Sequence, residues 1–190
     1  MLKMNYWTDK WDLHEDICPC DVHVNEWIAE QGFKNKLIYH FGTGTHHVVG
    51  IEQARNRSNN AVVAITASKE EYQAYIKLVS TNSAVAKSYI AYFGDIYLTN
   101  ARLLPDFDIV TMVHLCEFFF PNTASAEYGG MTDRGVLDLF TDKTRSGGHI
   151  LFYTRSIGFE KAKPIVAEWE KQKPVERVGE FKTLLIYRKK

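Results

Sequence analysis

The sequence of 190 residues has few cysteines and no excess of either charge. The three cysteines (Cys18, Cys20 and Cys116) are too few for a disulfide-linked secreted fold, so we expect a reducing, cytoplasmic location. Lys and Arg together number 23, as do Asp and Glu. Because general nucleic-acid binders carry a basic excess, we expect no nucleic acid among the partners of this chain.

Signals for membrane insertion or secretion are also missing. No apolar run reaches the roughly 18 residues that a membrane-spanning helix needs, so no membrane partner is expected. Residues 1–12 are polar and aromatic and lack the apolar segment of a signal peptide. Hydrophobic residues make up 45% and charged residues 24% of the chain, which excludes disordered and fibrous classes. The length then favours one globular domain.

From residue 36 onward, short apolar runs alternate with stretches of helical spacing. The runs that predict strands are 36–41, 61–65, 89–93, 107–115, 149–154, 175–178 and 181–188. The predicted helices are 47–57, a segment capped by Ser68 and Glu71, a segment around 135–140, and 159–173. Runs that are apolar on both faces indicate a mostly parallel sheet covered by helices on both sides. The last two strands flank Gly179-Glu180 and should pair antiparallel.

The first 35 residues differ from the rest, since they hold three of the four tryptophans and two of the three cysteines. We therefore divide the chain into an N-terminal cap segment, 1–35, and a Rossmann-like α/β domain, 36–190. Residues 22–31 predict a helix with Asp21 as its N-cap. The aromatic residues before it, Trp7 and Trp11 among them, are expected to form a lid over the site or a patch packed on the sheet.

The loop after the first predicted strand is the first candidate for a ligand site. Ligands of open doubly wound sheets bind beyond the carboxyl ends of the strands, at the point where strand order reverses. Here Gly42 and Gly44 allow a tight turn and a close approach to a ligand. The following helix offers free N–H groups. The alternative is a strand–helix turn that binds nothing.

Several motifs stand in a characteristic order along residues 36–190. They are Gly42-Thr-Gly44, Gly94-Asp95-Ile96, Leu104-Pro-Asp-Phe-Asp-Ile-Val110 and Ser146-Gly-Gly-His-Ile-Leu151. In this order and spacing the chain resembles the class I S-adenosylmethionine-dependent methyltransferases over about four-fifths of its length. The resemblance implies a doubly wound, mostly parallel sheet with an antiparallel C-terminal pair. It also implies S-adenosylmethionine as the cofactor.

The resemblance assigns cofactor-binding positions to seven residues of this chain. They are His40, Gly42, Gly44, His46, Thr66, Asp95 and Ile96. In the family pattern an acid stands where this chain has His40, and a third glycine stands at His46. An acid that holds the ribose hydroxyls ends the second strand, at Thr66 here. A threonine offers one hydroxyl in place of a carboxylate, and His46 brings a side chain where the family has open space. Binding of the cofactor is therefore expected to be weak, altered or lost.

The histidines near the predicted site form a second group of candidates. His40, His46 or His47, and His114 are expected to converge where strands one and four lie side by side, with Glu117 close to His114. One interpretation makes His114 or Glu117 a general base that deprotonates the acceptor. Another makes the cluster a zinc or iron site. A third treats each histidine as a hydrogen-bonded core residue. We predict catalytic roles for His114 and Glu117 and no bound metal.

Cys18-Pro19-Cys20, flanked by His14 and His23, is a further candidate metal motif. Zinc sites usually space two cysteines by two to four residues, so a single intervening proline strains chelation. A redox pair normally has two residues between its cysteines. A turn before a helix is therefore the favoured interpretation.

These observations favour a small-molecule methyltransferase that acts on oxygen or nitrogen. One alternative is a methyltransferase-like domain that binds a ligand or partner without methylating. The other is a metal-dependent enzyme that uses the histidine cluster. The segment Val113-His-Leu-Cys116 stands where nucleic-acid amino-methyltransferases carry Asn-Pro-Pro-Tyr, which argues against methylation of bases. The sequence identifies neither the acceptor nor the oligomeric state.

Overall fold

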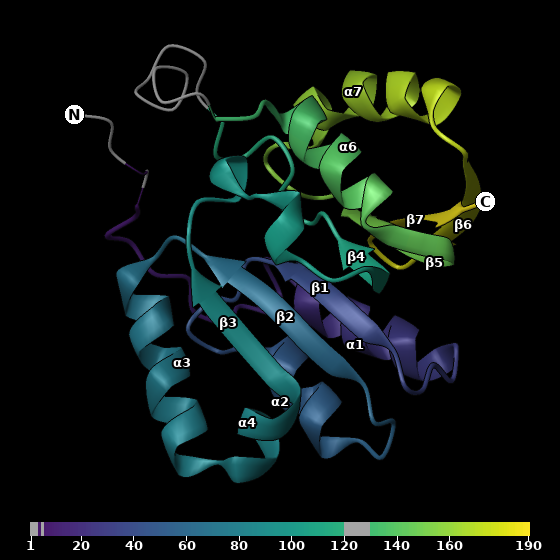
Figure 1. Ribbon diagram of the computed structural model, residues 1–190. Coiled ribbons are helices and arrows are strands. Elements are labelled where there is room, and N and C mark those ends of the chain that lie inside the picture. The colour runs from purple at the N-terminus through teal and green to yellow at the C-terminus, as the bar shows by residue number, and fades with distance from the viewer. Residues whose placement is uncertain (1–3, 5, 120–129) are drawn as a thin grey trace.

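The computed structural model describes residues 4, 6–119 and 130–190, and its centre is a seven-stranded sheet (Figure 1). The strands are β1 (Leu37–Phe41), β2 (Ala61–Thr66), β3 (Tyr89–Phe93), β4 (Phe107–Thr111), β5 (Thr144–Tyr153), β6 (Val175–Phe181) and β7 (Leu184–Lys189). Their order across the sheet is β3-β2-β1-β4-β5-β7-β6. The first five are parallel, and β7 is antiparallel to both neighbours. The predicted fold class is confirmed.

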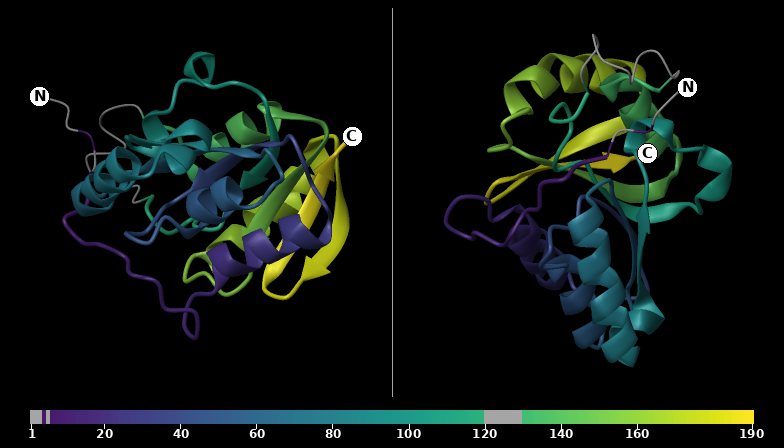
Figure 2. Two further views of the ribbon diagram at one scale, coloured as in Figure 1. Left: turned by 90° about the horizontal axis from the view of Figure 1, so that it is seen from below. Right: turned by 90° about the vertical axis from the view of Figure 1, so that its left-hand side faces the viewer.

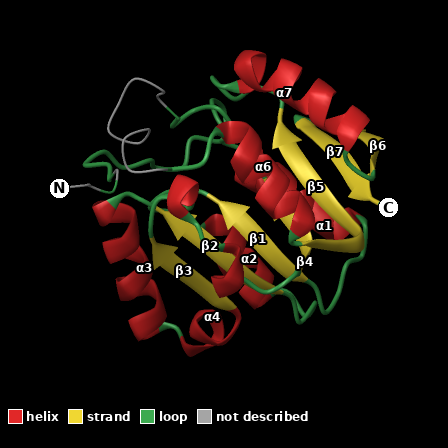
Figure 3. Cartoon of the chain, turned by 45° about the horizontal axis from the view of Figure 1, so that its top comes forward, coloured by secondary structure: helices red, strands yellow, loops and turns green. Residues whose placement is uncertain are grey.

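Helices cover both faces of the sheet, as Figure 2 (right) and Figure 3 show. They are α1 (Cys20–Glu30), α2 (Val48–Arg55), α3 (Lys69–Thr81), α4 (Ser83–Ser88), α6 (Asp133–Asp142) and α7 (Phe159–Gln172). Two short 3-10 helices, η1 (Ile96–Leu98) and η2 (Ala101–Leu103), follow β3. No helix in the described part of the chain is both long and apolar enough to cross a bilayer.

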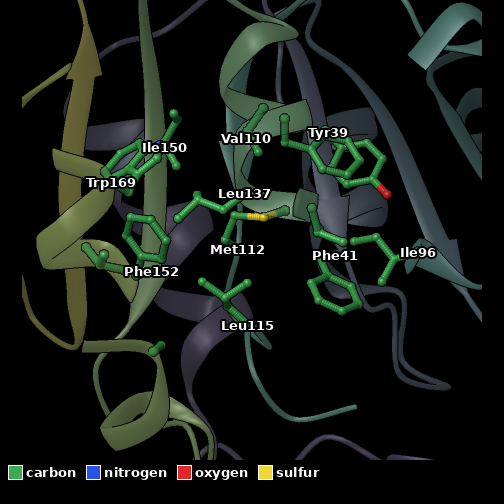
Figure 4. Close-up of a cluster of buried hydrophobic side chains, with 14 of the residues drawn as sticks. Tyr39, Phe41, Ile96, Val110, Met112, Leu115, Leu137, Ile150, Phe152 and Trp169 are labelled. Atoms are coloured by element: carbon green, nitrogen blue, oxygen red, sulfur yellow. The ribbon is translucent and has the colours of Figure 1, made fainter. Parts of the chain in front are cut away.

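Alternation along the strands divides the buried side chains into two cores. Tyr39 and Phe41 point to the layer of α6 and α7, where Leu137, Phe152 and Trp169 are buried (Figure 4). Residues of β1 that point the other way, such as Ile38, meet α1, α2 and α4. Because α1 contributes buried residues to this second core, the segment before residue 36 is partly structural.

Three predicted boundaries are wrong. β4 ends at Thr111, so His114 lies in the turn that follows the strand. β5 begins at Thr144, so the pair Gly147-Gly148 lies inside the strand and does not precede it. Gly148 packs against β4, where a Cβ would lie 2.8 Å from the carbonyl oxygen of Asp108, so a glycine is needed at this point of the strand. The final hairpin turns at Lys182, which has φ of 52°, and Gly179 lies inside β6 where the register shifts.

The start of the first helix also differs from its prediction. α1 begins at Cys20, and Pro19 occupies the position before it with φ of −80°. Asp21 is therefore inside the first turn and does not cap the helix. Its carboxylate faces the sheet instead, where it meets His40 and His46.

Candidate functional site

A cavity of about 440 Å³ lies at the carboxyl edge of the parallel strands, where β1 and β4 are neighbours and the strand order reverses. The N-terminal segment forms one wall, with Trp7 and Trp11 in the lining. Trp7 bridges to Ser68, and the Trp11 carbonyl oxygen accepts a hydrogen bond from the Thr45 amide at 2.8 Å. The segment is therefore fastened to the loops that follow β1 and β2.

Eight of the nine residues predicted for the site line this cavity. They are Gly42, Gly44, His46, Thr66, Asp95, Ile96, His114 and Glu117. His40 is not among the lining residues, because its position on β1 turns the ring toward α1. There it is 2% exposed and lies 2.9 Å from the Thr111 hydroxyl. Its Nε2 lies 3.4 Å from the Asp21 carboxylate, so His40 supports the cavity wall from behind.

Both glycines adopt left-handed backbone conformations, with φ of 94° at Gly42 and 55° at Gly44. Imidazoles occupy the space that glycine leaves open at each. A Cβ on Gly42 would lie 2.6 Å from the ring of His114, and one on Gly44 would overlap the ring of His46. The glycines therefore serve the turn and the packing of two histidines. A ligand that enters this loop would meet imidazole edges as well as backbone.

His114 forms an ion pair on the cavity wall. Its Nδ1 lies 3.0 Å from the Glu117 carboxylate, which also accepts a hydrogen bond from the Ser156 hydroxyl. Burial disfavours the charged imidazole, but Glu117 more than offsets this and raises the pKa of His114 to about 9. The same pairing outweighs burial at Glu117 and lowers the pKa of its carboxyl. At neutral pH the imidazole of His114 is therefore protonated on both nitrogens and positively charged.

Glu71 provides a carboxylate beside the end of β2. Its Oε2 accepts hydrogen bonds from the hydroxyls of Thr66 at 2.6 Å and Thr43 at 3.1 Å, and its Oε1 accepts one from the Trp11 amide at 3.3 Å. Burial raises the pKa of this carboxyl, and the hydroxyl donors oppose that shift. Ser68 caps α3 as predicted, by accepting a hydrogen bond from the Glu71 amide. The Glu71 side chain itself turns into the cavity.

The cavity lining is rich in acid. Among its described residues six carry carboxylates: Asp9, Asp12, Asp21, Glu71, Asp95 and Glu117. Arg155 is the one lysine or arginine in that lining. Burial alone would raise the pKa of Asp21, but His40 and His46 reverse the effect and hold it at about 2. Such a site attracts cations and repels polyanions.

The predicted histidine cluster is divided between two environments. His47 is turned away from the cavity, and its ring lies 2.8 Å from the Tyr89 hydroxyl and 2.9 Å from the Glu71 carbonyl oxygen. Burial lowers its pKa to about 4. Within residues 4, 6–119 and 130–190, no three His, Cys, Asp or Glu side chains are placed to hold a metal ion. The metal-dependent alternative therefore has no ligand set there.

Solved structures share this architecture at low sequence identity. A protein from Staphylococcus aureus provisionally named as a caffeoyl-CoA O-methyltransferase superposes with a TM-score of 0.65 at 11% identity, over 95% of this chain and 86% of its own. The precorrin-6y C5,15-methyltransferase of Geobacter metallireducens gives 0.61 at 14% identity, over 94% of both chains. The fold is that of the class I methyltransferases. A [4+2]-cyclase, SpnF, shares this methyltransferase fold with a TM-score of 0.60 at 13% identity, over 94% of this chain and 64% of its own.

By sequence alone, no family model and no curated protein matches the chain.

Two carboxylates that line the cavity, Asp21 and Glu71, were not predicted as site residues from the sequence. Asp21 was assigned as a helix cap, and Glu71 as the partner of Ser68 in a capping box. Both assignments rest on local spacing, which does not report the direction of a side chain. The sequence did contain one indication for Glu71: it lies in the first turn of the helix that follows a predicted strand, and that strand ends without an acid.

Proposed function

We propose that this chain transfers the methyl group of S-adenosylmethionine to an oxygen or nitrogen atom of a small molecule. The observation that carries the proposal is the Glu71 carboxylate in the cavity, 2.6 Å from the Thr66 hydroxyl. The resemblance led us to expect an acid for the ribose hydroxyls at Thr66. Glu71, in the first turn of α3, brings a carboxylate to the end of β2. It therefore supplies the acid that the strand end lacks because Thr66 stands there.

The charges of the cavity suit this cofactor. S-adenosylmethionine would supply an electrophilic methyl group on a positively charged sulfonium. Six carboxylates against one arginine and the protonated His114 in the described lining favour a cationic ligand over a neutral one of the same shape. Asp95 and Ile96, which follow β3, are the candidates for contact with the adenine. Asp95 also accepts a hydrogen bond from the Tyr97 amide at 3.0 Å, which fixes this loop.

His114 and Glu117 are the candidates for handling the proton of the acceptor. The ion pair holds a proton on His114 at neutral pH, so the imidazole accepts one from an acceptor only after losing its own. Ser156 and Glu117 fix the orientation of the ring. Positioning and exclusion of water would contribute most of the remaining rate, because methyl transfer needs an in-line approach.

The acceptor is proposed to be a small molecule with an apolar part. Trp11, Ile17 and Ile157 line the cavity and are 60%, 72% and 86% exposed, so an apolar surface is available at its mouth. A nucleic acid would bring phosphates toward six carboxylates, which is unfavourable.

Calorimetric titration of Glu71→Gln with S-adenosylmethionine tests the proposal. Loss of a charged hydrogen-bond acceptor in the site should weaken binding about 10- to 100-fold. Glu70→Gln is the matched control, since Glu70 is the exposed neighbour on the same helix turn. Equal affinities in the two variants would remove Glu71 from the site.

The second candidate is a ligand-binding domain that does not methylate. This candidate is favoured by the rings of His46 and His114, which lie against Gly44 and Gly42. There they occupy space beside the loop after β1 that a cofactor would need. Under this alternative the chain binds a cation in the acidic cavity, but S-adenosylmethionine gives no product with any acceptor. Absence of cofactor binding in a titration supports this second candidate before an acceptor is known. If the cofactor does bind, an assay for methyl transfer is needed to separate the two.

A further inference from the structure

We propose that Cys18 and Cys20 are an oxidation site on the cavity wall, where they form a reversible disulfide. Both residues line the cavity, and their sulfur atoms lie 3.6 Å apart. Cys18 is half-buried in the segment before α1, whereas Cys20 is buried at the first position of the helix. The proposal concerns the oxidation of these two thiols and does not depend on methyl transfer.

The backbone permits this bond. Pro19 has φ of −80° and ψ of 12°, a compact conformation that keeps its two neighbours about as close as in a helix. For helical residues two apart, α-helix geometry gives a Cα–Cα separation of about 5.5 Å. Disulfides span Cα separations of about 4.4–6.8 Å. The sulfur atoms must approach by roughly 1.5 Å, since a disulfide is about 2.05 Å long. Cys18 precedes the helix, so rotation of its side chain achieves this while α1 stays intact.

The two thiols differ in reactivity. A hydrogen bond from Cys20 lowers the pKa of Cys18 to about 6, against the effect of burial, and the charge of His114 adds to this shift. The pKa of Cys20 is correspondingly raised by its hydrogen bond to Cys18 and by burial. Cys116 provides an internal reference, because burial and Asp133 raise its pKa to about 12. Cys18 is therefore the attacking thiolate.

The oxidant is proposed to be a low-molecular-weight disulfide such as glutathione disulfide. The Cys18 thiolate attacks one sulfur, the reagent S–S bond breaks, and one glutathione thiolate leaves. Cys20 then attacks the Cys18 sulfur of this mixed disulfide, and the second glutathione leaves with the proton of Cys20. Two protein thiols are oxidised and one reagent disulfide is reduced to two thiols.

Oxidation would change the charge of the cavity wall. It removes the Cys18 thiolate whose charge acts on His114, and it removes the one proton of Cys20, whose sulfur lies 3.3 Å from the Asp21 carboxylate. Tyr153, a residue that is 3% exposed and lines the cavity, also lies beside these thiols. Occupancy of the cavity and the redox state of the pair should therefore affect each other.

Incubation of the full-length protein in glutathione buffers of increasing oxidised fraction tests the proposal. Intact-mass measurement should show loss of two hydrogens, and peptide mapping after alkylation should place the bond between Cys18 and Cys20. Cys20→Ser should instead accumulate one glutathione on Cys18, because no resolving thiol is present. Cys18→Ser should give neither product, and Cys116→Ser should behave as the unmodified chain.

The outcomes are separate from those of the methyl-transfer test, since no cofactor is added. A wild-type chain that keeps three free thiols in the most oxidising buffer overturns the proposal. So does glutathione found first on Cys116, or a Cys20→Ser variant that carries no adduct. Reversal of the mass change by added reduced glutathione is the expected final result.

Discussion

His47 and His114 follow neighbouring strands of one sheet, yet their environments leave one neutral and the other positively charged at neutral pH. His47 packs in the layer of α2 and α4, where its ring contacts neutral hydrogen-bond partners and burial lowers its pKa to about 4. His114 lies in the cavity beside Phe41, where Glu117 raises its pKa to about 9. A histidine at the carboxyl edge of the sheet therefore takes its charge state from the carboxylate, if any, that it meets.

The largest expected effect concerns the pH dependence of catalysis. If His114 is the base, turnover should rise about tenfold per pH unit and level off near pH 9, where the imidazole loses its proton. Glu117→Gln removes the charge that raises the pKa, so the plateau should move to lower pH.

Replacement of the His114 imidazole is a second test of its role as the base. His114→Gln should lower turnover by about 100-fold or more, with a small change in cofactor affinity. His23→Gln on the far side of α1, whose ring contacts Thr183, is the control. Equal losses of turnover and affinity in His114→Gln would make His114 a structural residue.

The next effect is acid destabilisation through His47. Its folded pKa of about 4 lies below the ordinary value of 6.5, so the stabilisation is complete above pH 6.5 and is lost as the pH falls toward 4. The loss should be on the order of 3 kcal/mol. Urea unfolding of His47→Gln should show a weaker pH dependence over this range, whereas exposed His14→Gln should keep it. An unchanged slope in His47→Gln would contradict the assignment.

Alkaline pH should destabilise the chain through His114, with the opposite sign. Its folded pKa lies above 6.5, so the stabilisation is full below pH 6.5 and is lost as the pH rises through about 9. Because the pair opens to the cavity, we expect about 2 kcal/mol, less than for His47. Unfolding of Glu117→Gln measured from pH 6 to pH 10 should lack this loss. A variant that retains it would place the titrating group elsewhere.

The sheet was predictable from the sequence because its parallel strands are apolar on both faces and alternate with helices. Two of the wrong strand boundaries fell where glycine was taken for a turn. Gly148 and Gly179 lie inside strands, and Lys182 makes the final turn with a left-handed conformation. Local composition does not distinguish a glycine that ends a strand from one that lets two strands approach.

The site was predictable in its location but not in its charges. Gly42 and Gly44 marked the loop, and the strand order brought it to the cavity. Sequence spacing gave no direction for the side chains of Asp21 and Glu71, which only the packing of α1 and α3 against the strand ends determines. For the same reason the sequence grouped His47 with His40 and His114, whereas the fold turns its ring away from the cavity.

Calorimetric titration of the wild-type protein with S-adenosylmethionine tests the central claim most directly, that the acidic cavity is a site for this cofactor. We expect one site with micromolar affinity, and stabilisation in a thermal melt of about 2.7 kcal/mol when the ligand is at a hundred times its dissociation constant. Absence of heat and of any shift in melting temperature at millimolar ligand would contradict it.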